Sequence, residues 1–134
     1  MQRSPILADG VRRRYARKLL GMKSEGTAKL VRIFLGESDR WKGQPLHVAI
    51  VEEMRRAGLA GATVFKGILG FGAHSVVHAA RIVDLSSDLP VMIELVESEE
   101  KVEAFLPTLD TMVSEGLVTL ENVHIIAYKA GEPK

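Results

Sequence analysis

The residues best suited to chemistry in this chain gather around one glycine-bracketed turn. The turn is Gly70-Phe71-Gly72, and His74 and Ser75 follow it directly. Glycine lets backbone N–H groups approach an anion closely, so these five residues are candidates to contact a small anionic ligand. A long segment without clear periodicity continues to residue 88, and long excursions of this kind often carry function. An ordinary loop that needs positive φ angles at its glycines would explain the same pattern.

Two histidines of the same segment suggest an alternative, a metal site. His74 and His78 stand four residues apart, which on a helix places two imidazoles on one face within reach of one metal ion. The sequence specifies no third ligand, so two surface histidines are the simpler interpretation. A divalent-cation site at His74 and His78 is therefore kept as an alternative hypothesis.

The chain's only tryptophan, Trp41, is flanked by Arg40 and Lys42. This trio could stack on a base and contact a phosphate. The alternative is that Trp41 packs against the sheet or against a neighbouring subunit. Glu37 and Asp39 lie in the same stretch, but spacing identifies no nucleophile or base to work with them. We therefore do not expect an enzyme.

The distribution of charge and the absence of cysteine narrow the class of protein. Residues 1–23 hold seven basic residues and one acid, for a net charge of +6, whereas residues 24–134 carry a net charge of −5. An acidic body is a poor candidate for binding phosphate backbones, so no nucleic-acid partner is expected. A chain without cysteine fits a reducing cytosol, and no apolar run approaches the roughly 20 residues of a membrane-spanning helix. We predict a cytoplasmic protein.

The basic residues 1–26 are interpreted as an extension that is disordered, and residues 27–134 as one domain. A short basic arm for nucleic acid or a membrane surface is an alternative for the extension. The domain is long enough for one hydrophobic core and too short for two.

The pattern of apolar residues predicts six elements in the domain. Strands are expected at 27–36, 62–69, 91–96 and 117–128, the last with an irregularity near Glu121-Asn122. A first helix runs from Pro45 to Gly58, which ends it. A second begins after Ser98 and continues to Gly116, with Pro107 expected to kink it or to start a new turn.

This order of elements, βαββαβ, is the split βαβ arrangement of an α+β ferredoxin-like fold. Two helices then cover one face of a four-stranded antiparallel sheet. The other face has no cover from within the chain, and its strands are apolar. A homo-oligomer is the usual solution, and we predict one.

Several blocks of the sequence also resemble a known family. The chain resembles the bacterial family called domain of unknown function 190, within the nitrogen regulatory protein P-II superfamily, over residues 27–128. The blocks that carry the resemblance are Gly36-Glu37, Gln44-Pro45-Leu46, Gly58-Leu59-Ala60-Gly61-Ala62-Thr63-Val64, Gly67-Ile68-Leu69-Gly70-Phe71-Gly72, Asp88-Leu89-Pro90-Val91 and Gly116-Leu117-Val118-Thr119-Leu120-Glu121.

The resemblance implies a trimer that binds adenine nucleotides in clefts between subunits and signals through the loop 70–88. The motif at the base of that loop corresponds to Gly70, Phe71 and Gly72, and His74 falls near a glutamine that P-II proteins use beside the nucleotide. The chain departs from the pattern after the second helix. P-II proteins have a glycine-rich turn with a phosphate-binding lysine there, whereas this chain has the segment 114–121, whose carboxylates would repel a triphosphate.

The predicted function is a P-II-like signalling protein that binds a small anionic effector, with an adenine nucleotide as the candidate and a protein partner at the loop. The ligand-contacting residues are predicted to be Trp41, Gly70, Phe71, Gly72, His74 and Ser75. The alternatives are a divalent-cation tolerance protein that uses His74 and His78, and an interaction module without a ligand.

Overall fold

Four strands form one antiparallel sheet in the order β4-β7-β1-β8. The computed structural model describes residues 27–72, 78–79 and 88–129, so the predicted extension 1–26 and most of the segment 70–88 lie outside the described residues. The strands of the sheet are β1 (Thr27–Gly36), β4 (Thr63–Lys66), β7 (Pro90–Glu97) and β8 (Leu117–His124). This is the order of the predicted ferredoxin-like fold, which is confirmed.

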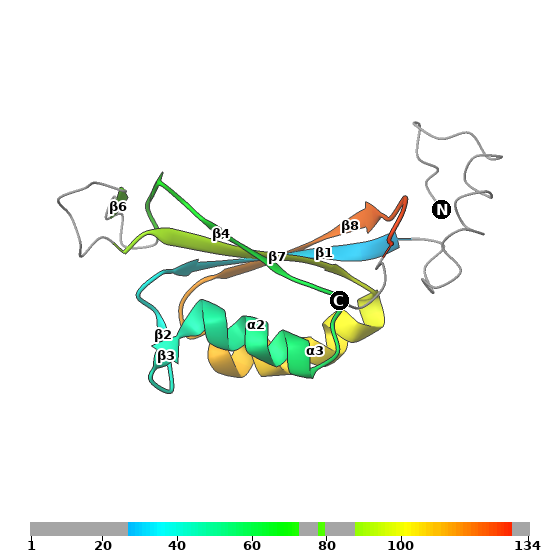
Figure 1. Ribbon diagram of the computed structural model, residues 1–134, viewed down its shortest axis with the longest axis horizontal. Coiled ribbons are helices and arrows are strands. Elements are labelled where there is room, and N and C mark those ends of the chain that lie inside the picture. Colours follow the sequence, from blue (N-terminus) through cyan, green and yellow to red (C-terminus); the bar gives the residue numbers. More distant parts are fainter. Residues whose placement is uncertain (1–26, 73–77, 80–87, 130–134) are drawn as a thin grey trace.

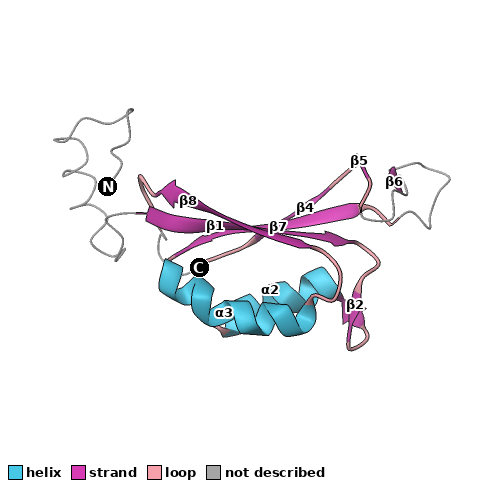
Figure 2. Cartoon of the chain, turned by 180° about the vertical axis from the view of Figure 1, so that it is seen from behind, coloured by secondary structure: helices cyan, strands magenta, loops and turns pink. Residues whose placement is uncertain are grey.

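Two helices pack on the same side of this sheet, as Figures 1 and 2 show from opposite directions. They are α2 (Leu46–Arg56) and α3 (Glu99–Met112). Two short hairpins complete the described structure, β2 (Arg40–Trp41) with β3 (Gln44–Pro45) and β5 (Leu69–Gly70) with β6 (His78–Ala79). Within the described residues, neither helix is long and apolar enough to cross a membrane.

The hydrophobic core lies between the helices and the sheet. Alternate residues of β1 and β7 point into it, and the apolar stripes of α2 and α3 close it from the other side. Ile33, Ile50 and Ile93, one each from β1, α2 and β7, are fully buried at its centre. The apolar residues that alternate along the strands and those that recur every three or four residues along the helices therefore form one core, the first from the sheet side and the second from the helix side.

Local signals set the ends of the helices. Gly58, at φ +77°, follows the last turn of α2 and donates its N–H to the carbonyl of Arg55 at 3.1 Å, as a C-terminal glycine does. The hydroxyl of Ser98 accepts the N–H of Lys101 at 3.4 Å at the start of α3. α3 continues through Pro107 to Met112, so the proline does not start a new helix there. Pro107 is exposed, so its ring faces away from the hydrophobic core.

The terminal strand corrects a second prediction. β8 pairs with β1 without interruption, with Leu30 opposite Glu121 and Lys29 opposite Asn122, so the expected irregularity at these positions is wrong. The reason is that both polar side chains have partners across the strands. Asn122 accepts a hydrogen bond from the Nζ of Lys29, and Glu121 reaches Arg32. The strand also ends at His124 rather than at residue 128.

The predicted strand 62–69 is likewise two elements. β4 stops at Lys66, and β5 begins at Leu69 in a separate two-stranded sheet with β6. Gly67 lies at the break and donates its N–H to the carbonyl of Pro90 at 2.7 Å. The chain therefore leaves the main sheet at Gly67, directly after β4, where Gly67 contacts Pro90.

Candidate functional site

Three segments that are far apart in the sequence meet where the segment 70–88 leaves the sheet. We call this place the loop base and define it by residues 36–38, 66–72 and 88–90. Two backbone hydrogen bonds join these segments, from the N–H of Glu37 to the carbonyl of Leu89 at 2.8 Å and from Gly67 to Pro90. Both ends of the segment 70–88 are thus fixed to the same end of the main sheet.

Two glycines of the loop base are required by the ring of Pro90. A Cβ at Gly67 would lie 2.6 Å from the Cγ of Pro90, and a Cβ at Gly70 would lie 2.9 Å from the same atom. Carbon atoms that are not bonded to each other do not approach so closely, so only glycine lets the chain after β4 lie against this ring. Gly72 has open space around it. The glycines of the sequence motif therefore differ in role, because Gly70 packs on Pro90 and Gly72 does not.

The charges of the loop base are mostly carboxylates. The N–H of Ser38 donates to Oδ1 of Asp88 at 2.7 Å, and the N–H of Gly36 donates to Oδ2 of Asp39 at 3.0 Å. The Nζ of Lys66 lies 2.7 Å from Oε1 of Glu37. An incoming anion would therefore meet the ammonium of Lys66 with the carboxylate of Glu37 beside it.

The predicted ligand-contacting residues are only partly brought together by the described structure. Gly70 lies in β5, where its backbone pairs with that of His78, and Phe71 and Gly72 follow it on the surface. Phe71 is 72% exposed, which leaves its ring free to contact a ligand or a partner. His74 and Ser75 lie outside the described residues.

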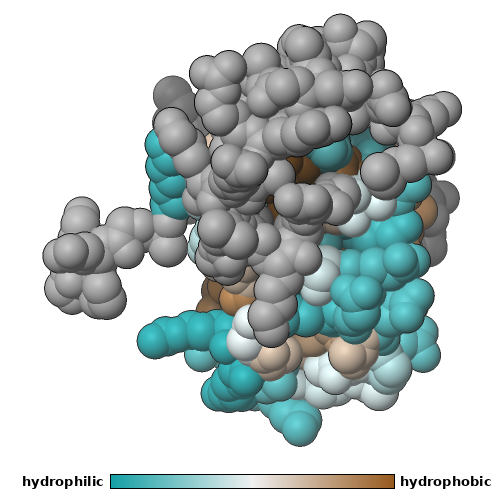
Figure 3. Space-filling model, turned by 90° about the vertical axis from the view of Figure 1, so that its right-hand side faces the viewer, coloured by the Kyte–Doolittle hydropathy of each residue, from teal (hydrophilic) through white to brown (hydrophobic). Residues whose placement is uncertain are grey.

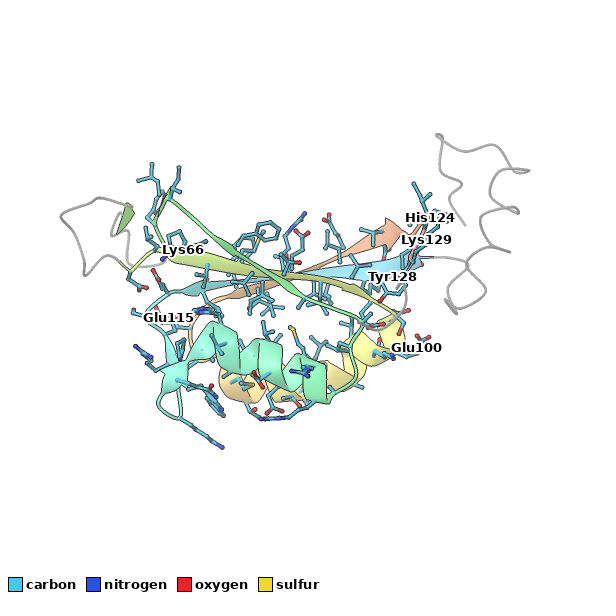
Figure 4. All side chains as sticks on the ribbon, in the orientation of Figure 1. Lys66, Glu100, Glu115, His124, Tyr128 and Lys129 are labelled. Atoms are coloured by element: carbon cyan, nitrogen blue, oxygen red, sulfur yellow. The ribbon has the colours of Figure 1, made fainter. Side chains whose placement is uncertain are left out.

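The metal hypothesis stays untested for the same reason. Neither His74 nor the side chain of His78 is described, and among the described residues no group of three His, Asp or Glu side chains could hold a metal ion. Figure 4 shows His124 at the opposite end of the sheet from Lys66, near Tyr128 and Lys129. His124 therefore plays no part at the loop base.

Trp41 lies away from the glycine motif within one subunit. Lys42 at φ 47° and Gly43 at φ 85° form the tight turn of the β2–β3 hairpin, and this hairpin is on the helix side of the sheet, whereas β5 and β6 project from the other side. The ring of Trp41 packs against the hydrophobic core, and the Nζ of Lys42 lies 5.4 Å from its centroid. These contacts favour the packing interpretation, and a ligand contact at Trp41 stays a prediction.

Two residues of the loop base escaped the sequence reasoning as site residues, Lys66 and Pro90. Lys66 was visible only as a charge that interrupts an apolar strand, and Pro90 only as part of a loop signal. Figure 4 shows Glu115, from the segment after α3, at the same end of the molecule as Lys66 but on the helix side.

Comparison with known proteins places the chain in a family. A family model described as DUF190, Uncharacterized ACR, matches residues 28–125. A UPF0166 protein of Aquifex aeolicus (strain VF5) is 38% identical over 98 residues, which cover 73% of this chain and 92% of the relative. A UPF0166 protein of Methanocaldococcus jannaschii is 37% identical over 99 residues, which cover 73% of this chain and 91% of the relative.

Solved structures share the fold at lower identity. CPII, a nitrogen regulatory PII-like protein from Thiomonas intermedia K12 bound to ADP, AMP and bicarbonate, superposes with a TM-score of 0.54 at 21% identity, over 76% of this chain and 91% of that one. A putative PII-like signaling protein from Thermus thermophilus superposes with a TM-score of 0.55 at 23% identity, over 75% of this chain and 90% of that one. At these identities the likeness establishes a PII-like ferredoxin fold.

Proposed function

The chain belongs to the DUF190 family, and from this membership we propose that it acts as a PII-like regulatory protein rather than as an enzyme. It assembles as a homo-oligomer, expected to be a trimer, and binds a small anionic effector at the loop base, in the clefts between subunits. The segment 70–88 then responds to the effector and meets a partner protein.

The observation that carries this proposal is how the loop base is built. One end of the segment 70–88 is held by Gly67 and Gly70 against Pro90, and the other by Asp88 on the N–H of Ser38. A ligand that shifts the strand ends by a fraction of an ångström would therefore change the position of both ends of the segment together. Such a mechanical link is what an effector-responsive loop requires.

Lys66 is the cation best placed to meet the effector. Its side chain is 55% exposed and that of Glu37 is 35% exposed. Ion pairs as exposed as this are worth only about 0–1 kcal/mol, so Lys66 can exchange Glu37 for another anion at little cost. Glu37, Asp39 and Asp88 remain nearby, which favours an effector of low charge over a triphosphate.

Adenine nucleotides and bicarbonate are the first candidates to test, because ADP, AMP and bicarbonate are bound in the CPII structure that shares this fold. Light scattering first fixes the number of subunits. Isothermal titration calorimetry then measures binding of ATP, ADP, AMP, cyclic nucleotides and bicarbonate. We expect saturable binding of at least one of them, near one ligand per subunit, with AMP or ADP preferred to ATP.

Two variants locate the site. Lys66→Met should raise the dissociation constant about tenfold, because an ammonium contact to an anion is worth roughly 1.5 kcal/mol or more. Gly72→Phe should abolish binding without unfolding the protein, since no atom of the described residues lies within 4 Å of a Cβ at Gly72. Lys101→Met, on the exposed surface at the start of α3, is the matched control for Lys66→Met and should bind as the wild type does.

The proposal fails if the oligomer binds none of these ligands, or if Lys66→Met and Gly72→Phe bind as tightly as Lys101→Met. Titration with zinc and copper(II) separates the metal alternative. Stoichiometric tight binding of either ion that is lost on replacing both His74 and His78 with alanine would favour a metal-binding protein instead.

A further inference from the structure

The face of the sheet opposite the helices carries an apolar row that crosses all four strands. Phe65 of β4 lies opposite Met92 of β7, Met92 lies opposite Phe34 of β1, and Phe34 lies opposite Leu117 of β8. Phe34 is 39% exposed, Phe65 47% and Leu117 57%, although all three are large hydrophobic side chains. We call these four residues the apolar row. A contiguous set of this kind on a sheet face indicates an interaction surface.

A group of charges lies beside the apolar row on the same face: Arg32 and Glu94 are the next residues on this face of β1 and β7, and Glu121 lies one such position further along β8. Arg32 of β1 lies opposite Glu94 of β7, and its Nε donates to Oε2 of Glu94 at 3.0 Å. Its Nη1 donates to Oε1 of Glu121 of β8 at 2.8 Å. The hydrogen bond to Glu94, together with the nearby charge of Glu121, raises the pKa of Arg32 above its usual value. We call these three residues the Arg32 cluster.

We propose that the Arg32 cluster fixes the register in which a second copy of this chain packs on the apolar row. This inference rests on the homo-oligomer of the proposed function and adds which residues select its geometry. Covering the apolar row brings protein atoms over the adjacent cluster and removes its water. Ion pairs that lose water contribute little net affinity, but a charge left without its partner is strongly unfavourable. The pairs within one chain leave further donor and acceptor atoms of the cluster that need polar partners in the second copy, so a register that covers the cluster with apolar side chains is disfavoured.

A second copy fits this surface better than a partner of a single charge sign. Across the strands the charges run acid, base, acid, from Glu94 through Arg32 to Glu121. Each copy therefore offers both a guanidinium and carboxylates to the copy that packs on it. An acidic partner would be repelled by the two glutamates and a basic partner by Arg32. A face that carries both signs can match its charges to those of another copy of the same chain.

Among the described elements, no helix covers the apolar row. β4 and β8 are the edge strands, and their side chains are largely exposed. Figure 1 shows both helices on the other side, so no described helix lies over the apolar row. Figure 3, which views the end of the molecule where β1 begins, likewise shows hydrophobic surface between hydrophilic residues. Beyond Arg32 on the same face, Leu30 is 8% exposed, whereas Val96, which lies opposite it on β7, is 38% exposed, so the exposed apolar surface extends past the Arg32 cluster on β7.

Two variants of the full chain test the inference by light scattering across a dilution series. Arg32→Met leaves Glu94 and Glu121 facing each other without a cation, and we expect the dissociation constant of the oligomer to rise about tenfold or more. The uncharged variant Arg32→Met/Glu94→Leu/Glu121→Leu removes all three charges. This variant should associate at least as tightly as the wild type. It should form oligomers of several different masses, because the charges that disfavour other registers have been removed.

Arg56→Met is the matched control, since Arg56 pairs with Glu53 on the exposed surface of α2. It should assemble as the wild type does, and far-UV circular dichroism checks the folding of each variant. The inference is overturned if Arg32→Met has the dissociation constant of Arg56→Met. It is equally overturned if the uncharged variant forms one species of wild-type mass, a test that remains available if Arg32→Met does not fold.

The same measurements separate this inference from the proposed function. If the wild-type oligomer binds an effector while the Arg32 variants assemble normally, the inference alone fails. If Arg32→Met dissociates while the wild-type oligomer binds none of the nucleotides or bicarbonate, the proposed effector fails and the inference stands. A wild type that is monomeric at every concentration refutes both the second copy and the clefts between subunits.

Discussion

Replacing Gly67 with alanine tests whether the packing of the loop base on Pro90 contributes to stability. The new methyl group would lie 2.6 Å from the Cγ of Pro90 and 3.2 Å from its carbonyl oxygen. A proline ring cannot rotate away, and the carbonyl belongs to β7. Either the start of β7 or the end of β4 must therefore move, and the hydrogen bond from Gly67 to Pro90 moves with it.

The cost can be worked from two opposing effects. Overpacking of a close contact costs about 1–3 kcal/mol. Alanine also lowers the entropy of the unfolded chain, which stabilises a compatible position by about 0.4–1 kcal/mol. The net effect of Gly67→Ala should be a loss of about 1–2 kcal/mol in the free energy of unfolding. With a urea dependence of about 2 kcal/mol/M, the midpoint should fall by roughly 0.5–1 M.

Gly61→Ala is the control, because a Cβ at Gly61 has no atom within 4 Å. Only the effect on the unfolded chain remains there, so this variant should be unchanged or slightly more stable. Urea unfolding followed by circular dichroism, at one fixed subunit concentration because self-association shifts stability, compares the two. The reasoning is refuted if the midpoint of Gly67→Ala is equal to or above that of Gly61→Ala.

Two further substitutions test other parts of the fold. Pro107→Ala should raise the free energy of unfolding by about 1–3 kcal/mol, since Pro107 is an exposed interior position of α3 and alanine restores a helical N–H; a lower thermal midpoint than the wild type would contradict this. Glu97→Ala should cost about 1.5–3 kcal/mol, because the buried carboxylate accepts the N–H groups of Ala60 at 2.7 Å and Ser98 at 2.9 Å. Urea unfolding measures the loss, and a midpoint equal to that of Glu100→Ala, on the exposed surface of α3, would show that these bonds contribute nothing.

Much of the fold was predictable because its signals are local. The apolar stripe of α2, the glycine after its last turn and the serine before α3 each act within a few residues of chain. The order of elements then restricts the topology to very few arrangements. The errors arose where local signals met distant partners. Two polar residues that looked like an irregularity in β8 found partners across β1, and the strand expected at 62–69 divides where Gly67 meets Pro90.

The candidate site divides in the same way. Gly70-Phe71-Gly72 was visible because glycine chemistry is local, but its relation to Pro90 was not. Trp41 and the glycine motif were both candidates for one ligand, yet the structure puts them on different sides of the sheet within one subunit. Lys66 became a candidate only in the tertiary structure, because β1 and β4 end at the same end of the sheet and this brings Glu37 next to Lys66.

The sequence by itself determined which segments form strands and helices, which of their residues are apolar, and where glycine or proline must stand. Only the tertiary structure decided which residues become neighbours. Arg32 and Glu121 are 89 residues apart in the chain, and no local pattern indicates that they share one face of a sheet. Strand register makes that choice, because a shift of one position would send every side chain to the opposite face and would dissolve both the apolar row and the Arg32 cluster.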